Sequence, residues 1–340
     1  MCHALRGPLP RVGIVGLLTA VYCGIGASAG AAAEPAPKVA FKVSDPQITE
    51  ASGLAVSRRH PGIVYTHNDS DGAPTIFAIG PNGRTKATFT IAGAEARDWE
   101  GMALGRDGAG RPALFVADIG DNLDGAWPYV TVYRVPEPRE LRDQPLRATP
   151  FRLKYADGPR NAEAVLIHPR TNRLYVASKM LNGALYAAPA RLRPNRLHVL
   201  RKVGDAPPIA TDGAFAPDGR TFAVRTYGAA HVYEMTPRGP GDRLRVVNLP
   251  DQEQGESIAF SLDGRSLLAG SEGVGQPVWR VALPADARPG DPGPAASATE
   301  RSPGAADEGP GRKSGDTITG LAVVAGLAMV VAVVVIRRRT

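Results

Sequence analysis

Short apolar runs, each preceded by an acidic residue, recur along this chain and set its period. An acid, one or two small residues and an apolar stretch appear together five times. The intervals between these acids are 50, 63, 49 and 44 residues. Intervals of this size are typical of one four-stranded propeller blade or one short solenoid repeat. The five acids are Glu50, Glu100, Glu163, Asp212 and Glu256.

Each repeat can be divided into four short strands, most clearly in the second repeat. There, apolar and β-branched residues fill GMALG, ALFVAD, YVTVYRV and FRLKY, and turn-forming residues separate them. No run within the repeats has helical periodicity. The pattern predicts an all-β fold of four-stranded meanders. Tight turns are expected after each first strand, at 58–62, 105–111, 168–173, 216–220 and 261–265.

A single meander cannot bury both of its faces, so the copies must pack around an axis or stack along a line. Near-continuous apolar strands such as ALFVA indicate a sheet covered on both faces. This favours a five-bladed β-propeller over residues 38–284 rather than a β-solenoid. Residues 38–44 precede the first acid, and the fifth repeat stops after its third strand. We therefore expect 38–44 to form the outer strand of the last blade and close the ring.

The number of blades depends on the long second interval. Its 63 residues include the Pro- and Arg-rich segment PEPRELRDQPLRATP, which we interpret as a loop. The alternative is that this segment belongs to a sixth, degenerate blade. A six-bladed propeller is therefore the alternative to five blades.

The amino-terminal end differs in composition from the repeats. Residues 1–33 contain Arg6 and Arg11, then an apolar run and the small-residue stretch ASAGAAAE. This order is typical of a secretory signal peptide, with an uncleaved anchor as the alternative. Both cysteines, Cys2 and Cys23, lie in this leader. The mature protein would have no disulfide and no cysteine-based site.

The carboxyl-terminal end has the features of a membrane anchor. Residues 318–336 carry no charge, and at ~1.5 Å per residue they could cross a hydrocarbon layer of ~30 Å. Three arginines follow, and basic residues mark the cytoplasmic side of a span. A buried core helix is the rival interpretation. We expect a flexible Pro/Gly/Ala-rich stalk at 285–317, a transmembrane helix at 318–336 and a cytoplasmic tail at 337–340.

The charge of the repeat region argues against nucleic acid as a partner. The whole chain has 40 Lys and Arg against 33 Asp and Glu, a formal net charge of +7. Eight of the basic and five of the acidic residues lie outside 34–290, which leaves 32 against 28, or +4. A scattered excess of this size is not the basic patch that nucleic acid requires.

Strand order predicts where the polar residues gather. In an antiparallel meander, the start of the first strand and the end of the second lie on one side. The five acids mark the starts, so we expect them in a ring at the mouth of a central channel. Crowded carboxylates raise one another's pKa unless cations compensate, and bound Ca²⁺ is one solution. The other interpretation is architectural, with each acid accepting backbone N–H hydrogen bonds.

Residues beside the acids differ between repeats, as a site on a symmetric scaffold requires. His67 or Asp98 is a candidate base, and Lys179 or Arg225 is a candidate to hold an anion. For His67, the alternative is a turn histidine bonded to backbone. The candidate ligand-binding residues are Asn68, Asp69, Asp71, Asp118, Asp121, Asn122 and Glu272.

Several motifs together resemble a known group of propellers. ITEASGLAVS, VYTHNDSDG, RDWEGMAL, FVADIGDN, NAEAVLIHP and LYVASK are similar to secreted actinobacterial WD40-like or phytase-like propeller proteins, and more distantly to the SdiA-regulated propeller family. The likeness covers roughly residues 45–280. It implies a β-propeller of a group that is often exported and sometimes binds calcium. The chain lacks the Trp-Asp dipeptides of a true WD40 protein.

Two functions follow as hypotheses. The first is a cell-surface, membrane-anchored propeller that binds an extracellular ligand or protein through its acidic face. The alternative is a divalent-cation-dependent hydrolase of phosphate or ester substrates that uses the same face. The spread of candidate residues over all five repeats favours the binding module, because an enzyme usually needs one tight cluster.

Overall fold

In the computed structural model, which describes residues 35–69, 72–123 and 125–288, the chain forms β-strands and one 3₁₀ turn, η1 (Ala285–Ala287). The predicted all-β class is confirmed for these residues, which contain no α-helix. None of their segments is a helix of the length and apolarity that crossing a membrane requires. The predicted signal peptide and transmembrane helix lie outside them.

Every strand but one belongs to five antiparallel groups of four, here called modules 1 to 5. Each is given from its innermost to its outermost strand. Module 1 contains β2 (Ala55–Val56), β3 (Val64–His67), β4 (Thr75–Ile79) and β5 (Thr85–Ala92); module 2 contains β6 (Trp99–Arg106), β7 (Pro112–Asp118), β8 (Val130–Pro136) and β10 (Thr149–Tyr155); module 3 contains β11 (Ala162–Ile167), β12 (Leu174–Ser178), β13 (Ala184–Ala187) and β14 (Leu197–Asp205); module 4 contains β15 (Asp212–Phe215), β16 (Thr221–Arg225), β17 (Ala229–Thr236) and β18 (Gly239–Asn248); module 5 contains β19 (Ile258–Phe260), β20 (Ser266–Ala269), β21 (Pro277–Ala282) and β1 (Lys38–Lys42).

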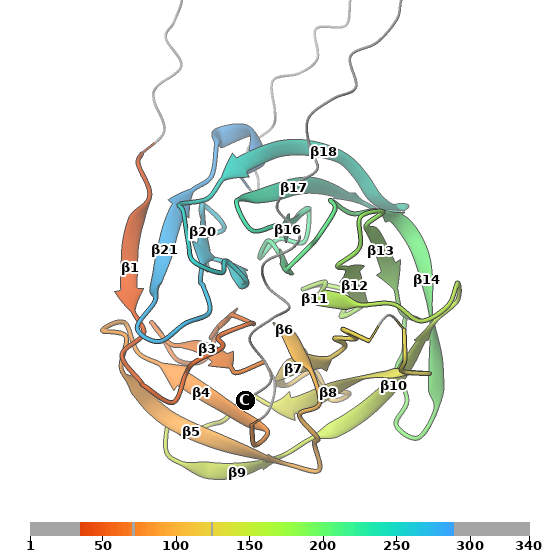
Figure 1. The fold of residues 1–340 in the computed structure, drawn as a ribbon, viewed down its shortest axis with the longest axis horizontal. Coiled ribbons are helices and arrows are strands. Elements are labelled where there is room, and N and C mark those ends of the chain that lie inside the picture. The colour runs from red at the N-terminus through yellow and green to blue at the C-terminus, as the bar shows by residue number, and fades with distance from the viewer. Residues whose placement is uncertain (1–34, 70–71, 124, 289–340) are drawn as a thin grey trace, which may run out of the picture. The chain divides into compact units, whose positions relative to one another are not determined.

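The modules lie around a common centre (Figure 1). Their inner strands β2, β6, β11, β15 and β19 contact one another in that order, and β19 contacts β2. Strand β1 pairs antiparallel with β21, so the predicted use of 38–44 as the outer strand of the last group is confirmed. The first and last strands of the ring therefore meet in one sheet.

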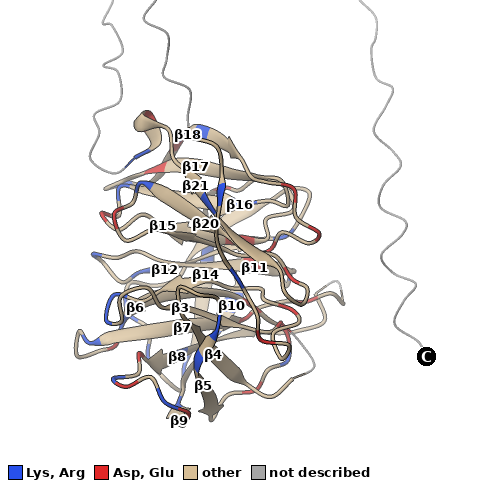
Figure 2. Ribbon diagram, turned by 90° about the vertical axis from the view of Figure 1, so that its left-hand side faces the viewer, with Lys and Arg blue, Asp and Glu red and all other residues tan. Residues whose placement is uncertain are grey.

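The hydrophobic core is divided among the spaces between modules. Five clusters of buried residues fill the five interfaces between neighbouring modules. Tyr65 packs with Trp99 between modules 1 and 2, and Phe77 packs with Leu268 between modules 1 and 5. Middle strands such as β12 are buried on both faces, as the continuous apolar runs predict. Each sheet is thus covered by its two neighbours, while many charged positions lie in the loops (Figure 2).

The predicted turns have the backbone conformation that their residues suggest. Each of the five turns after a first strand contains one residue with positive φ, a region that favours Gly and Asn. These residues are Gly62 (φ 77°), Gly110 (φ 80°), Asn172 (φ 57°), Gly219 (φ 69°) and Gly264 (φ 69°).

The Pro-rich insertion differs from its predicted loop structure. Part of it, β9 (Gln144–Arg147), pairs in parallel with β5 and adds a fifth strand to the sheet of module 1. The long interval lets the chain return to the outer edge of module 1 before it forms β10. Modules 2 and 3 are similarly joined at their outer edges, because β10 and β14 pair in parallel. After β21, Ala287 is buried in the cluster between modules 4 and 5.

Inner strands pack so closely that one glycine has no room for a side chain. A Cβ at Gly101 would lie 2.7 Å from Glu163 O and 2.7 Å from Val165 N, both on the inner strand of module 3. We expect Gly101→Ala to lower the free energy of unfolding by about 1–3 kcal/mol, because backbone atoms must move. Urea unfolding measures this.

Gly108→Ala is the matched control, since a Cβ there meets nothing within 4 Å. It should change the free energy of unfolding by less than about 0.5 kcal/mol. Equal stability of the two variants would contradict the packing described here.

Candidate functional site

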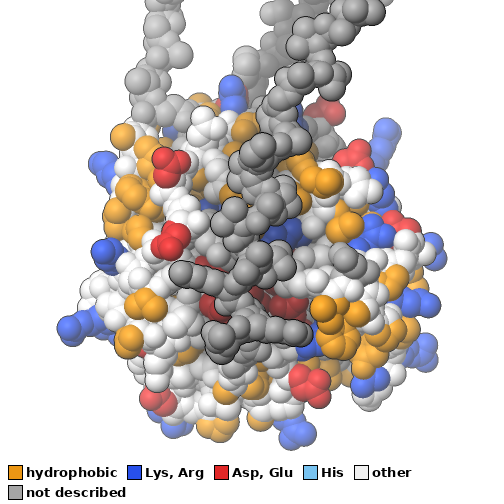
Figure 3. All heavy atoms as spheres, viewed as in Figure 1, with side chains coloured by type: hydrophobic (Ala, Val, Ile, Leu, Met, Phe, Trp, Pro, Cys, Tyr) orange, Lys and Arg blue, Asp and Glu red, His pale blue; other side chains and the backbone are white. Residues whose placement is uncertain are grey.

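The starts of the inner strands and the ends of the second strands meet at one end of the ring, as strand order predicts. Trp99 N donates to Asp69 O over 2.9 Å, and Asp98 N donates to Asp118 Oδ1 over 3.1 Å. These bonds hold the start of β6 beside the chain that leaves β3 and β7. Acidic side chains gather around the centre of the face in Figure 3.

Three carboxyl groups form the tightest acidic cluster in the described part of the chain. Asp69, Asp98 and Glu100, here called the acid triad, each offer one oxygen, and these oxygens lie within 4.8 Å of one another. Gly120 makes the space for them, because a Cβ there would collide with Asp98 Oδ2 and Glu100 Oε1. Ser52 Oγ donates to Glu100 Oε2 over 3.3 Å. The triad therefore joins modules 1 and 2.

Burial and mutual repulsion disfavour the charged forms of the triad. Burial, followed by the charges of Asp98, Glu272 and Glu50, raises the pKa of Asp69 to about 8. Burial also raises the pKa of Asp98, against the opposing attraction of Arg97. The pKa of Glu100 is raised well above its usual value by burial and by the neighbouring acids. A cation at this position would relieve the repulsion.

Lys179 supplies such a cation for two other acids of the predicted ring. Its ammonium group forms an ion pair with Glu163 and lies 3.9 Å from Glu256 Oε1. Burial opposes the charge of Lys179, but the two carboxylates raise its pKa above the usual value. Its side chain is 20% exposed and lies over the Tyr227 ring. The predicted position of Lys179 on the acidic face is confirmed.

Arg225 and Asp212 join modules 4 and 5 and are not accessible for binding. Arg225 is fully buried and donates to Ser257 O (2.6 Å), to Gly270 O (2.7 Å) and to a Gln252 side-chain oxygen (2.7 Å). Asp212 Oδ2 accepts from Ile258 N over 2.7 Å. The prediction of an anion-holding Arg225 is wrong, because its guanidinium is buried and bonded to interior groups. Asp212 is buried as well and does not belong to the group of potential metal ligands found among the described residues. Asp212 fits the architectural interpretation, in which the acid accepts a backbone N–H hydrogen bond.

The five predicted metal ligands do not form one ligand set. Only Glu100 belongs to the group of potential ligands found among the described residues, and the other two members come from the flanking motifs. Glu163 and Glu256 have Lys179 as their counterion. Glu50 acts on the site through its charge, which raises the pKa of Asp69.

The predicted role of His67 must also be corrected. Its side chain is fully buried and meets the Trp99 ring edge-on, with 5.5 Å between ring centroids. Its Nδ1 lies 2.9 Å from Asn68 O. Burial lowers the pKa of His67 to about 4, so the ring is neutral. A base must reach its substrate, so the prediction of a catalytic His67 is wrong and the backbone-bonded alternative is confirmed.

The remaining predicted residues divide into two groups. Asp118 and Glu272 act on the triad, because Asp118 accepts from Asp98 N and the charge of Glu272 raises the pKa of Asp69. Other side chains bond within their own loops or to an adjacent one. These are Asn68, which accepts from the backbone at 49–50; Asp121, which accepts from the backbone at 126–127; and Asn122, which accepts from Asn161. Asp71 lies outside the described residues.

Two contributors were not predicted from the sequence as site residues. Gly120 provides space for the triad, and its signal was its place inside the DIGDN motif. Arg97 lies 3.4 Å from Asp118 Oδ1 and stacks over the Trp127 ring at 4.2 Å. This guanidinium is the positive group at the rim of the triad.

Neither a protein-family model nor a curated protein matches this chain. The chemistry of the site must therefore be argued from its residues. Three carboxyl groups with raised pKa values and a cation at the rim are suited to binding a divalent metal ion or a positively charged group.

The raised pKa values predict how stability depends on pH in the presence of a chelator. The folded-state pKa values of Asp69 (about 8) and Asp118 (about 6) lie above the usual value of 3.8. The folded state then holds more protons, so its stability is greatest at low pH and falls as pH rises through these values. Urea unfolding at pH 7, 8 and 9 should give decreasing free energies, in a range where the lowered pKa of His67 no longer contributes.

Asp69→Asn should flatten this pH dependence, because the amide cannot ionise. The exposed Asp251 is the control position, and Asp251→Asn should keep the slope of the original protein. Stability that rises between pH 7 and 9 would contradict the assignment.

Proposed function

We propose that this chain is an exported, membrane-anchored, five-bladed β-propeller that binds an extracellular ligand through a divalent cation, Ca²⁺, at the acid triad. Export and anchoring are proposed from the residue patterns at 1–33 and 318–340. The motifs that resemble phytase-like propellers include all three triad residues.

Five blades are favoured over six by the packing of the modules. The described residues form five clusters of apolar side chains, one at each interface between modules, including the interface between modules 5 and 1. The alternative sixth blade would have to come from the insertion. That segment instead contributes β9 to the sheet of module 1.

A buried, unpaired oxygen carries the proposal of a cation. Asp69 Oδ1 is buried and has no hydrogen-bond partner among the described residues. Leaving such an oxygen without a partner costs free energy, whereas coordination would satisfy it. Gly120 leaves the space in which Asp98 and Glu100 oxygens face one another. The donors also fit, because Ca²⁺ takes only oxygen ligands, about six to eight of them.

The ligand would complete the coordination sphere. Three carboxyl groups provide at most six oxygens, and bidentate geometry for all three is unusual, so some positions remain for water or ligand oxygens. Arg97 and Lys179 lie at the rim, where their positive charges can bind an anionic group. The proposed ligand is therefore an oxygen-rich molecule with a carboxylate, phosphate or vicinal hydroxyl groups.

Thermal melting tests the cation. Millimolar Ca²⁺ should raise the Tm of the protein, because binding to the folded state alone stabilises it by about 2.7 kcal/mol at a hundred times Kd. The increase should be larger at pH 8 than at pH 5, because protons compete for the same carboxylates. Asp98→Asn and Gly120→Ala should each remove most of the shift.

Asp251→Asn is the control, since it removes one exposed acid and should keep the full shift. Equal shifts in Asp98→Asn and Asp251→Asn would place the cation elsewhere. No shift with millimolar Ca²⁺ at pH 8 would rule out the proposed site.

The alternative is a divalent-cation-dependent hydrolase of phosphate or ester substrates. One observation favours it, namely that Asp69 and Asp98 are adjacent carboxyl groups and the pKa of Asp69 is raised to about 8. One carboxyl can then hold a proton while the other is ionised, as acid–base catalysis requires. His67 and Arg225 take no part, because both are buried.

Turnover of p-nitrophenyl phosphate and p-nitrophenyl acetate with Ca²⁺ separates the two functions. A hydrolase should lose on the order of a hundredfold or more in rate in Asp98→Asn but not in Asp251→Asn. Equal rates in the original protein and both variants would leave the binding module as the function.

A further inference from the structure

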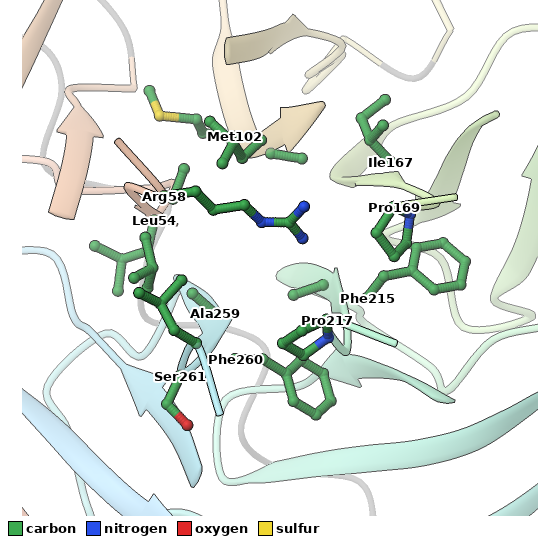
Figure 4. Close-up of a pocket in the computed structure, with 16 residues that line it drawn as sticks. Leu54, Arg58, Met102, Ile167, Pro169, Phe215, Pro217, Ala259, Phe260 and Ser261 are labelled. Atoms are coloured by element: carbon green, nitrogen blue, oxygen red, sulfur yellow. The ribbon is translucent and has the colours of Figure 1, made fainter. Parts of the chain in front are cut away.

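The end of the ring opposite the triad contains a second feature. The inner strands begin at the acidic end, and their last residues line a cavity of about 60 Å³ at the other end. All five modules contribute to its walls, which are mostly apolar (Figure 4). The lining includes Leu54, Met102, Ile167, Phe215, Ala259 and Phe260.

One charged side chain enters this apolar space. Figure 4 shows the Arg58 side chain extending from module 1 toward the middle of the lining residues, with its guanidinium group among them. Arg58 remains accessible to solvent. Among the described residues, Arg58 has no hydrogen-bond or ion-pair partner. Its guanidinium therefore has five donor groups free for an acceptor.

Arg58 differs from the residues at the equivalent position of the other four modules. Each module closes the turn after its inner strand with the same type of backbone hydrogen bond. These bonds run from Ser57 N to Ile63 O (3.0 Å), Asp107 N to Arg111 O (2.8 Å), His168 N to Arg173 O (3.0 Å), Ala216 N to Thr221 O (3.0 Å) and Ser261 N to Ser266 O (2.9 Å).

The residue after each donor is therefore equivalent among the modules. It is Gly108, Pro169, Pro217 and Leu262 in modules 2 to 5, and Arg58 in module 1. Of these four residues, Pro169, Pro217 and Leu262 line the cavity, and none of the four is charged. A turn of this kind does not need an arginine, so the fold does not account for Arg58.

The surrounding charges leave the position electropositive. Partial burial, followed by repulsion from Arg106, lowers the pKa of Arg58, and the charge of Glu137 opposes this. Glu137 already accepts from Ser57 Oγ over 2.6 Å, so that acid is engaged with its own neighbour. An anion in the cavity would supply the missing negative charge.

We propose that this cavity binds a small oxyanion, a carboxylate or a phosphate, through two parallel hydrogen bonds from Arg58. Planar guanidinium groups bind both anions in this way. The volume is enough for one small anion or a few water molecules. The apolar walls would contact a short apolar substituent on the anion. This site shares no residue with the acid triad.

Anion binding to the full chain, from which divalent cations and then the chelator have been removed by dialysis, tests the proposal without the cation site. Inorganic phosphate, acetate and butyrate are each titrated by calorimetry at constant ionic strength, with chloride as the reference salt. We expect one of the oxyanions to bind and to raise the Tm. The anion with the lowest Kd identifies the chemistry, and tighter binding of butyrate than acetate would demonstrate contact with the apolar walls.

Two variants and one control locate the anion. Arg58→Gln should weaken binding by about ten- to hundredfold, as the loss of hydrogen bonds to a charged group predicts. Arg58→Lys keeps the charge but loses the planar pair of donors, so its affinity should be intermediate. Arg59→Gln is the matched control, because Arg59 is the adjacent exposed arginine and does not line the cavity.

Equal affinity of Arg58→Gln and Arg59→Gln would overturn the proposal. The proposal would also be overturned if none of the three oxyanions bound to the original protein at 10 mM. That concentration is about the weakest affinity of interest for a small ligand. In either case Arg58 would only close the end of the channel. Because no arm contains a divalent cation, a negative result here leaves the proposed cation site unaffected.

Discussion

Each module of this protein has two apolar faces and only its two neighbours to cover them. A middle strand such as β12, buried along its whole length, is stable only between two other sheets. This requirement repeats at every module, so it can be met everywhere only if the first and last modules also meet. The pairing of β1 with β21 joins the two ends of the described chain within one sheet. The cluster around Phe77 and Leu268 then covers the last apolar faces.

Closing the ring brings the inner strands together, and this crowding produces the electrostatic character of the acidic end. Acids at the strand starts are forced into one another's neighbourhood and away from water. The protein balances them in different ways. Asp212 is held by backbone, and Glu163 and Glu256 share the ammonium group of Lys179. Arg97 and Lys179 attract the acid triad only from its rim, so burial and the neighbouring acids still raise the pKa values of Asp98 and Glu100.

The sequence predicts features with a local or periodic cause. Strand positions, turn residues and the joining of β1 to module 5 follow from apolar runs, from Gly and Asn, and from the missing fourth strand of the last repeat. Strand β9 was not predictable in the same way, because its partner β5 is about fifty residues earlier and its pairing adds an edge without changing the period. Its Pro content also resembles that of a loop.

The candidate site was predictable as a face but not as a set of atoms. Strand order places acids and polar motifs at one end of the ring, but it does not specify how deeply each side chain is buried. His67 and Asp69 are two residues apart, yet one packs under Trp99 while the other joins the triad. Arg225 and Lys179 occupy the ends of equivalent strands, and only Lys179 reaches the channel mouth. These outcomes depend on inter-module distances of a few ångströms, which no single repeat encodes.

Comparing equivalent positions among the five modules distinguishes residues that the fold requires from residues with another role. A residue type that recurs at one position of every module points to a need common to all of them, as the positive-φ residues do in the turns. A residue that departs from its equivalents has no such need to explain it. Arg58 at the apolar end departs from Gly108, Pro169, Pro217 and Leu262, and it does so beside a cavity to which all five modules contribute.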